Sequence, residues 1–400
     1  MDFTLSKEQK VQKNEYIEFF EAEMKDAPPE FHANPLEATY GSDECWEFHR
    51  AMQRKLADKG WLTMAWPEEY GGRDAPIIDQ LLFSEVHAAY HAPGVDGFGV
   101  KMFAPTVMLF ATEEQKKRIL PPIARGEVSY CQGWSEPNSG SDLASLVTRA
   151  EFRGDHYVVN GQKIWTTGAH RADHMFLLAR TDPEQKRGGG LSVFNIQDMK
   201  APGIEVRPIK YMNGSHFYNE VYFTDLIIPE EELIGEENAG WKSTRATMNF
   251  ERSGVGGFIS VRERLKEIIE YAKTTKRDGA FIIDSPIVRQ KLAKLHIDAE
   301  LGRALAYRVA WEQQSGNLSV SATLASQSKV FGSELTQRMA GFSTEIMGLH
   351  GQLEASPWAP LNGIMIDTYQ RCMGGNIAAG TSEIQRNIIA WAGLGLPRFN

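Results

Sequence analysis

The chain has 400 residues, of which 42% are hydrophobic and 24% charged, and its formal net charge is -9. This length can bury a large core and divide into two or three domains, and the composition is that of an ordinary globular protein. The net negative charge, without any cluster of Lys and Arg, argues against a nucleic-acid surface and favours small substrates and protein partners.

The cysteines and the N-terminus favour a cytoplasmic location. Cys45, Cys131 and Cys372 are too far apart for a Cys-X-X-Cys motif, and the histidines occur singly, so we expect reduced thiols and no metal site. The first residues have neither the basic nor the apolar region of a signal peptide, and no apolar run approaches the length of a membrane span. We therefore expect a cytoplasmic protein that does not enter the membrane.

The pattern along the first two thirds of the chain changes from helical to extended. Residues 1–125 predict an all-helical domain, with a Pro- and Gly-containing loop at 67–72. Residues 126–235 predict a β-barrel-like domain of antiparallel strands separated by Gly- and Pro-bearing turns. Asn160-Gly161 is the strongest hairpin signal in it. The expected strands are 156–159, 162–165, 175–179, 191–196, 204–207 and 220–228.

The helical period returns after residue 235. It is broken at 284–286 and around 348–360, so residues 236–400 predict a four-helix-bundle domain. The whole chain is then an α+β protein with the order helix, strand, helix. This order excludes a Rossmann unit, in which strands and helices alternate. A Gly-X-Ser-X-Gly elbow, a Walker motif and a His-Glu-X-X-His helix are also absent from the sequence.

Glu251 is a carboxylate where a helix should present apolar side chains. It lies seven residues before the first member of a stripe with three- and four-residue steps, so it shares that face. A carboxylate against an apolar interior has a raised pKa that suits proton abstraction near neutral pH. Alternatively, the helix starts near Trp241 and its first turns face water. The stripe consists of Phe258, Val261, Leu265, Ile268 and Ala272.

Four motifs resemble, in the same order, those of the acyl-CoA dehydrogenase family. They are SEPNSGSD at 135–142, NGQKIWTT at 160–167, FER at 250–252 and GTSEIQR at 380–386. The resemblance covers essentially the whole chain. It implies an enzyme that binds FAD, desaturates an acyl-CoA thioester and passes the electrons to an electron-transfer flavoprotein. It also implies a homo-oligomer, a tetramer.

The resemblance also implies where the flavin lies. The loop that starts at Trp134 is short and polar, so its backbone N–H groups can approach the ring; by composition alone it could be an ordinary turn between strands. Ser135 would contact the flavin, and Ser141 both flavin and thioester. Trp165 would cover the ring, and the Thr167 hydroxyl would reach toward N5. The other residues expected at the cofactor are Trp134, Gly140, Thr166, Glu345, Gly348, Thr381 and Glu383.

The position of the catalytic base differs within the family. Many members carry a Glu just before the Gly-Thr-Ser segment, where this chain has Ala379. The isovaleryl-type and long-chain-type enzymes carry it on the first helix of the C-terminal domain, before an Arg, as Glu251 and Arg252 are arranged here. The resemblance therefore supports Glu251 as the base for the α-proton. It implies that Arg252 and Asn249 lie at the CoA moiety.

The inter-subunit half of the cofactor site departs from the family pattern. Thr275 stands where many members have an Arg for the FAD pyrophosphate, Pro286 where they have a Gln, and Glu345 where another Gln is common. Arg277 or Arg289 could supply the missing charge. Some relatives of this kind work as pairs of unequal subunits, so a homologous second chain could be required.

Two segments bear on the substrate. The 66–72 loop and the 393–398 ending resemble the bacterial sub-branch that acts on branched, cyclic, aromatic or steroid-side-chain thioesters. We expect Tyr90, Asp96 and Phe98 to line the acyl pocket. Asp96 is either a second acid or base, or an ordinary turn residue.

Two other functions remain open. A flavin oxidase or monooxygenase on the same fold would use oxygen as the acceptor, and a Glu base counts against it. A catalytically silent subunit of a mixed complex is the other, and the presence of Trp165, Thr167 and Thr381 counts against that.

Overall fold

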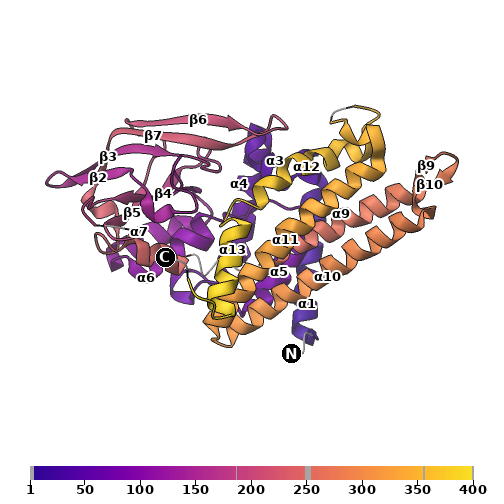
Figure 1. Ribbon diagram of the computed structural model, residues 1–400. Helices are drawn as coiled ribbons and strands as arrows, with labels where there is room; N and C mark the ends of the chain where they lie inside the picture. Colours follow the sequence, from indigo (N-terminus) through magenta and orange to yellow (C-terminus); the bar gives the residue numbers. More distant parts are fainter. Residues whose placement is uncertain (1–3, 186, 248–253, 355, 399–400) are drawn as a thin grey trace. The chain divides into compact units, whose positions relative to one another are not determined.

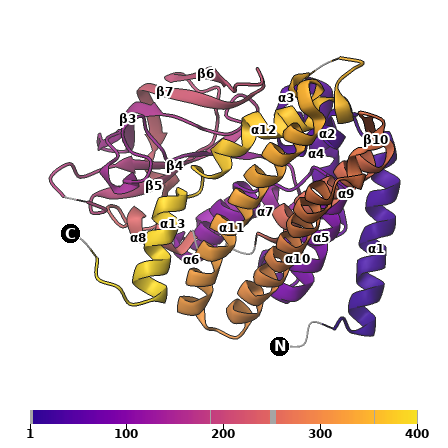
Figure 2. The same cartoon turned by 45° about the vertical axis from the view of Figure 1, so that its right-hand side comes forward.

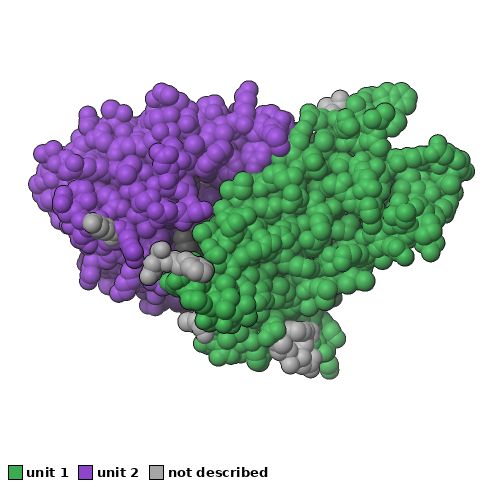
Figure 3. Space-filling model, viewed as in Figure 1, with its two compact units in different colours: residues 1–34, 76–92, 252–400 green, residues 35–75, 93–251 purple. Residues whose placement is uncertain are grey.

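The computed structural model describes residues 4–185, 187–247, 254–354 and 356–398. The chain divides into two compact units (Figure 3). The helical unit comprises residues 1–34, 76–92 and 252–400, and the sheet unit comprises residues 35–75 and 93–251. Both units are therefore built from segments that are discontinuous in the sequence.

The helical unit is formed by long helices that share one apolar core. Figures 1 and 2 show α9, α10 and α11 side by side, and α5 packs on α9 and α10. The five side chains of the predicted stripe, from Phe258 to Ala272, are all buried in this core, which confirms the stripe. The helices are α1 (Lys7–Glu23), α2 (Glu30–Ala33), α5 (Ile77–Ala89), α9 (Val255–Thr274), α10 (Pro286–Gln314), α11 (Leu318–Met347), α12 (Ile364–Gly375) and α13 (Ser382–Ile388).

The interruptions of the helical unit were predicted only in part. The breaks before Pro286 and after Met347 are confirmed, but a further break at 315–317 separates α10 from α11. Periodicity missed it because the apolar pattern resumes on its far side; Gly316, with φ +77°, makes the turn. A short hairpin of β9 (Lys276–Arg277) and β10 (Ala280–Phe281), also unpredicted, joins α9 to α10.

The sheet unit has one eight-stranded sheet among the described residues, with helices around it. The strand order is β6-β7-β3-β2-β4-β5-β8, with β1 paired to β4 (Figure 1). The strands are β1 (Tyr130–Gly133), β2 (Arg149–Phe152), β3 (His156–Lys163), β4 (His174–Arg180), β5 (Leu191–Ile196), β6 (Ile204–Lys210), β7 (His216–Pro229) and β8 (Leu233–Ile234). The helices are α3 (Pro35–Gly41), α4 (Asp43–Asp58), α6 (Ala104–Phe110), α7 (Glu113–Ala124) and α8 (Gly240–Thr247).

Four predicted strands, 175–179, 191–196, 204–207 and 220–228, are confirmed as parts of β4 to β7. The expectation of a wholly antiparallel sheet is wrong, because β1 and β2 pair with β4 in parallel. A parallel pair needs a long connection, which local alternation of side chains does not reveal.

The hairpin predicted at Asn160-Gly161 is wrong as well. These residues lie within the single strand β3, at a bulge where its pairing with β7 shifts register. Gly161 has φ +149°, and a Cβ there would lie 2.7 Å from the Thr148 Cα. The Asn160 amide exchanges two hydrogen bonds with Asp225 on β7, at 3.0 and 2.9 Å. The Asn-Gly pair therefore forms the bulge within β3. The chain reverses direction between β2 and β3 instead.

None of the helices in the described part of the chain is long and apolar enough to cross a membrane. Among the same residues, no group of three or more His, Cys, Asp and Glu side chains is placed to hold a metal ion. The three cysteines are free and buried.

Candidate active site

The loop from Trp134 to Ser141 follows β1 and forms a tight turn. Glu136 and Ser139 exchange two backbone hydrogen bonds, at 3.2 and 3.0 Å, so their N–H groups are already used within the turn. The Ser135 carbonyl accepts a hydrogen bond from the Ile164 N–H at 2.9 Å, which ties the loop to the end of β3. Ser135 is half-buried, whereas Gly140 and Ser141 are exposed.

A buried ion pair holds this loop against β3. The Lys163 ammonium donates to Glu136 Oε1 at 2.8 Å and to the Trp134 carbonyl at 3.0 Å. The side chains of Lys163 and Glu136 are only 0% and 3% exposed. Glu136 also accepts hydrogen bonds from the N–H groups of Val147 and Thr148, at 2.7 and 2.8 Å.

The pKa values of this pair reflect its burial. Burial lowers the pKa of the Lys163 ammonium, against the attraction of Glu136. Burial also opposes ionisation of Glu136, but the Lys163 charge and the hydrogen bonds outweigh it and bring the pKa of the carboxyl below its ordinary value. The two groups therefore form a charged pair that fixes two loops to the end of one strand.

The Trp165–Thr167 segment follows β3 after one intervening residue, Ile164, and has an unusual backbone. Trp165 has φ +61°, and its side chain is 55% exposed, meeting only the edge of Tyr218 at 5.9 Å between ring centroids among the aromatic contacts of the described residues. A bulky residue in this left-handed backbone conformation costs on the order of 1–3 kcal/mol in strain, and residues strained in this way are concentrated at functional sites. Thr166, by contrast, is buried, and Thr167 is half-buried.

Two buried polar atoms near these segments have no hydrogen-bond partner among the described residues. They are the indole Nε1 of Trp134 and the hydroxyl of Thr166. Buried polar groups are nearly always bonded, so each marks a place where a polar ligand fits. A flavin, which offers both donors and acceptors along a flat ring, is a ligand of that kind.

The helical unit contains a second group of predicted residues, on the turn before α13. Ala379 and Gly380 both have positive φ, +53° and +82°. The Thr381 hydroxyl caps α13 by accepting from the Ile384 N–H at 3.2 Å. Glu383 is exposed in the first turn of that helix. The Ser382 hydroxyl and the ammonium of Lys329, on α11, are further buried atoms without a partner in the described chain.

The predicted residues at the end of α11, Glu345 and Gly348, lie near positively charged side chains. Glu345 is exposed and forms an ion pair with Lys291 at 3.1 Å. Gly348 has φ +61°, and Arg277 reaches its loop by donating to the Ile346 carbonyl at 2.5 Å. Arg289, the other candidate for the missing charge, instead lines a hollow of about 320 Å³ on α10.

The residues expected in the acyl pocket do not lie together in one unit. Tyr90 belongs to the helical unit, where it stacks on Phe20 at 6.4 Å. Asp96 and Phe98 belong to the sheet unit. The Asp96 carboxylate accepts hydrogen bonds from the N–H groups of Phe98, Gly99 and Tyr130, at 3.0, 2.9 and 3.2 Å.

The Asp96 carboxylate is bound by the backbone of two segments. Burial raises the pKa of the Asp96 carboxyl to about 6, although the three N–H donors act in the opposite direction. Two of the N–H donors, Phe98 and Gly99, lie at the start of the 99–103 helical turn, and the third, Tyr130, lies on β1. Glu251, predicted as the base, and Asn249 and Arg252, predicted at the CoA moiety, lie outside the described residues.

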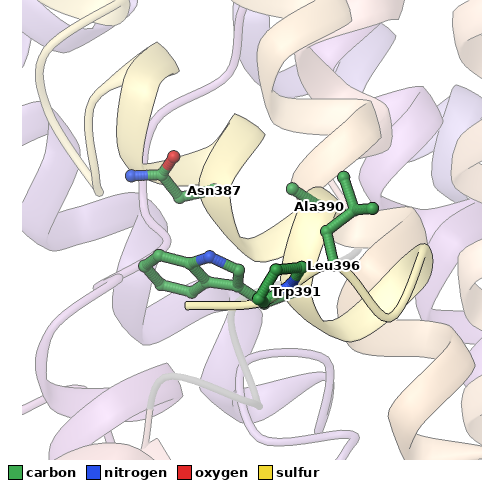
Figure 4. A pocket seen from close by; sticks show the side chains of 5 residues that line it. Asn387, Ala390, Trp391 and Leu396 are labelled. Carbon is green, nitrogen blue, oxygen red and sulfur yellow. The ribbon is translucent and has the colours of Figure 1, made fainter. Parts of the chain in front are cut away.

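A hollow of about 490 Å³ lies at the C-terminal end of the helical unit (Figure 4). Asn387, Ala390, Trp391, Leu396 and Pro397 line it, and none of these was predicted as a site residue. Arg398 lies over the Trp391 ring at 5.0 Å. The hollow therefore involves none of the motif residues.

Three residues that organise the motif segments were not singled out from the sequence. Glu136 and Lys163 lie within the quoted motifs. Their opposite charges, in otherwise uncharged parts of the two motifs, were the signal that could have predicted the ion pair. Asn219, which binds the backbone of Thr166, had no signal, because it is 53 residues away along the chain.

Comparison with known proteins agrees with the motifs. The N-terminal, middle and C-terminal domain models of acyl-CoA dehydrogenase match residues 6–127, 131–226 and 238–394. Acyl-CoA dehydrogenase FadE26 of Mycobacterium tuberculosis is 37% identical over 372 residues, which cover 91% of this chain and 92% of the relative.

Solved structures agree as well. The ChsE4-ChsE5 complex from Mycobacterium tuberculosis matches with a TM-score of 0.86 and 34% identity, and the Tcur3481-Tcur3483 steroid ACAD with 0.89 and 29%. Each match covers 100% of both chains.

A helical domain, a β domain and a second helical domain, with these matches, define an oxidoreductase that acts on CH–CH bonds. The chain belongs to the acyl-CoA dehydrogenase family. Members of this family are FAD-dependent flavoproteins.

Proposed function

We propose that this chain binds FAD and desaturates an acyl-CoA thioester, with Glu251 as the base that removes the α-proton. One observation carries the proposal for FAD. The Trp134 and Trp165–Thr167 segments are joined by the buried Glu136–Lys163 pair, and they carry an indole N–H and a hydroxyl without partners in the described chain. FAD, when bound, supplies the acceptor for the β-hydride at N5.

The protein's own groups then have distinct tasks. Trp134, Ser135, Gly140 and Ser141 hold the ring from the loop after β1. Trp165 shields it from water, and Thr166 and Thr167 supply hydroxyls from the segment after β3. Thr381, Glu383, Glu345 and Gly348 are further cofactor contacts that the motifs imply.

Arg277 is the better replacement for the Arg that many relatives place at the FAD pyrophosphate. Its guanidinium bonds to the Ile346 carbonyl, two residues before Gly348, and a planar guanidinium suits phosphate oxygens.

The base and the CoA contacts follow from the motif around Glu251. The Glu251 carboxylate takes the α-proton, and Arg252 and Asn249 bind the CoA moiety. This assigns the chain to the sub-branch that carries its Glu on the first helix of the C-terminal domain. The limits of the three domains, at residues 125 and 235, remain a prediction.

The names of the relatives favour one class of substrate and partner. One matched structure is described as a steroid ACAD, and two are named as pairs of different chains. We propose a cyclic acyl group, such as a steroid side chain or ring fragment, among the branched, cyclic and aromatic candidates. An electron-transfer flavoprotein would be the acceptor. A homotetramer, or a hetero-oligomer with a homologous chain, would be the assembly, in the cytoplasm.

Anaerobic titration tests the reaction class and the substrate together. The purified protein is titrated with straight, branched, aromatic and steroid-side-chain acyl-CoA esters, and the flavin band near 450 nm is followed. Bleaching by a cyclic ester is the expected result. Protein that retains FAD but is bleached by none of the esters would contradict the proposed dehydrogenation, and protein without FAD that gains it from a co-expressed homologue would support the hetero-oligomer.

Glu251→Gln tests the base. Because Gln cannot accept the α-proton but has nearly the same shape, the variant should keep FAD and ester binding and lose at least about 1,000-fold in flavin reduction, within the span that general base catalysis contributes. Glu270→Gln, an exposed carboxylate on α9, is the matched control and should reduce normally. Normal reduction by Glu251→Gln would place the base elsewhere.

A further inference from the structure

Asn219, on β7, holds both backbone groups of Thr166. The Thr166 N–H donates to the Asn219 backbone carbonyl at 3.0 Å, and the Asn219 side-chain Nδ2 donates to the Thr166 carbonyl at 2.9 Å. Asn219 is 0% exposed. Water therefore cannot replace the hydrogen bonds of its side-chain amide, and a change of rotamer would leave buried polar groups without partners. The backbone carbonyl and the side-chain amide of Asn219 therefore together hold the residue that lies between Trp165 and Thr167.

The Thr166 carbonyl decides which end of the Asn219 amide faces it, and two histidines bind the amide in that orientation. Since the Thr166 carbonyl can only accept, the NH2 end must face it, and the Oδ1 end then faces His216 Nε2 at 2.8 Å. His216 must carry its proton on Nε2 to donate there. The Asn219 NH2 group also reaches His170 Nδ1 at 3.2 Å, which must accept.

The second histidine is oriented in turn by the backbone. His170 carries its proton on Nε2, which faces the Tyr40 carbonyl at 3.3 Å. The His170 and His216 rings stack with centroids 4.1 Å apart and an interplanar angle of 25°. With these protons in place, the Asn219 amide has a single favourable orientation. A flipped amide would turn its NH2 group toward the His216 N–H donor and its oxygen toward the His170 Nδ1 acceptor.

The segment that Asn219 fixes needs this support. Trp165 holds a backbone conformation that bulky residues avoid, and its exposed ring has little packing of its own. Such a conformation persists only where the surroundings over-determine it. The bonds from Asn219 to the next residue, at 3.0 and 2.9 Å, are restraints of this kind.

We propose that Asn219, oriented by His216 and His170, is a positioning residue that sets the Trp165 ring and the Thr167 hydroxyl against the flavin. This inference rests on the proposed function, because it assigns these groups to the flavin. It goes beyond that proposal by assigning a role to three residues that lie outside every motif and contact no reacting atom.

Hydrogen exchange of the protein as purified, with no ester added, tests the restraint without any turnover. In Asn219→Ala, the peptide that covers residues 165–168 should exchange at least 10-fold faster than in the unchanged protein. Asn195→Ala is the matched control, because Asn195 is equally buried on β5 but bonds to Glu232 and Tyr130. It should leave exchange at 165–168 unchanged. Equal exchange in the two variants would overturn the proposal.

The reconstituted protein tests the consequence for the flavin. Asn219→Ala should change the visible circular dichroism of bound FAD and lower the limiting rate of flavin reduction at least 10-fold at saturating ester, with a smaller change in the ester concentration for half-maximal rate. Asn195→Ala, at a similar melting temperature, should do neither. A melting temperature that falls equally in both variants, with identical flavin spectra, would reduce Asn219 to a structural residue and sink the proposal.

His216 provides a second test if Asn219→Ala does not fold. His216 is only half-buried, so its replacement is milder. His216→Ala should show the same changes as Asn219→Ala, but smaller. His216→Gln can still donate to Asn219 and should behave like the unchanged protein. Failure of Gln to restore would contradict the orienting role. If the unchanged protein binds FAD but no ester bleaches it, the proposed reaction fails, while exchange and circular dichroism still decide the role of Asn219.

Discussion

Lys163→Met should destabilise the sheet unit by about 3–5 kcal/mol, the usual cost of breaking a buried ion pair. At the 2.8 Å that separates Lys163 from Glu136, the Coulomb attraction is about 6 kcal/mol at an effective dielectric constant of about 20. Met fills most of the volume and removes the cost of burying the ammonium. It leaves the Glu136 carboxylate buried without a countercharge and the Trp134 carbonyl without its donor.

Native-state hydrogen exchange of the β3 amides measures this change, because it reports the free energy of opening of the strand itself. The double variant Glu136→Gln/Lys163→Met should recover at least about 1 kcal/mol relative to Lys163→Met, since no charge is then left buried. Arg125→Met, which breaks an exposed pair with Glu127, is the control and should have little effect. A Lys163→Met variant within about 1 kcal/mol of the unchanged protein, or a double variant no better than the single one, would refute the reasoning.

Two further substitutions test the described structure. Gly168→Ala should destabilise the sheet unit by roughly 2–3 kcal/mol, because Gly168 has φ +69° and a Cβ there would clash with the Tyr40 ring. In Gly41→Ala, where a Cβ meets nothing within 4 Å, urea unfolding should show no such loss. Burial and Arg264 lower the pKa of His91 in the fold to about 4, so its neutral form is favoured and stability is lost as pH falls from 6.5 toward 4. His91→Asn, which tolerates the φ of +53°, should reduce the loss in unfolding free energy between pH 7.5 and 5 by about 2 kcal/mol; an unchanged pH dependence would contradict this pKa.

The sequence by itself determined the elements that depend on a local period. The stripe from Phe258 to Ala272 is buried, and four of the expected strands lie where alternation placed them, because the side-chain period of a helix or strand is a property of consecutive residues. The family, too, followed from four short motifs in order, and matches to all three domains confirmed it.

Only the tertiary structure decided how distant segments use these residues. Asn160-Gly161 has the local signature of a hairpin, but pairing with β7 and the close approach of Thr148 make it a bulge. The Glu136–Lys163 pair spans 27 residues, and the bond from Asn219 to Thr166 spans 53. Hydrogen bonds and ion pairs act over about 3 Å in space and have no period in the sequence, so only the folded chain shows which polar groups meet.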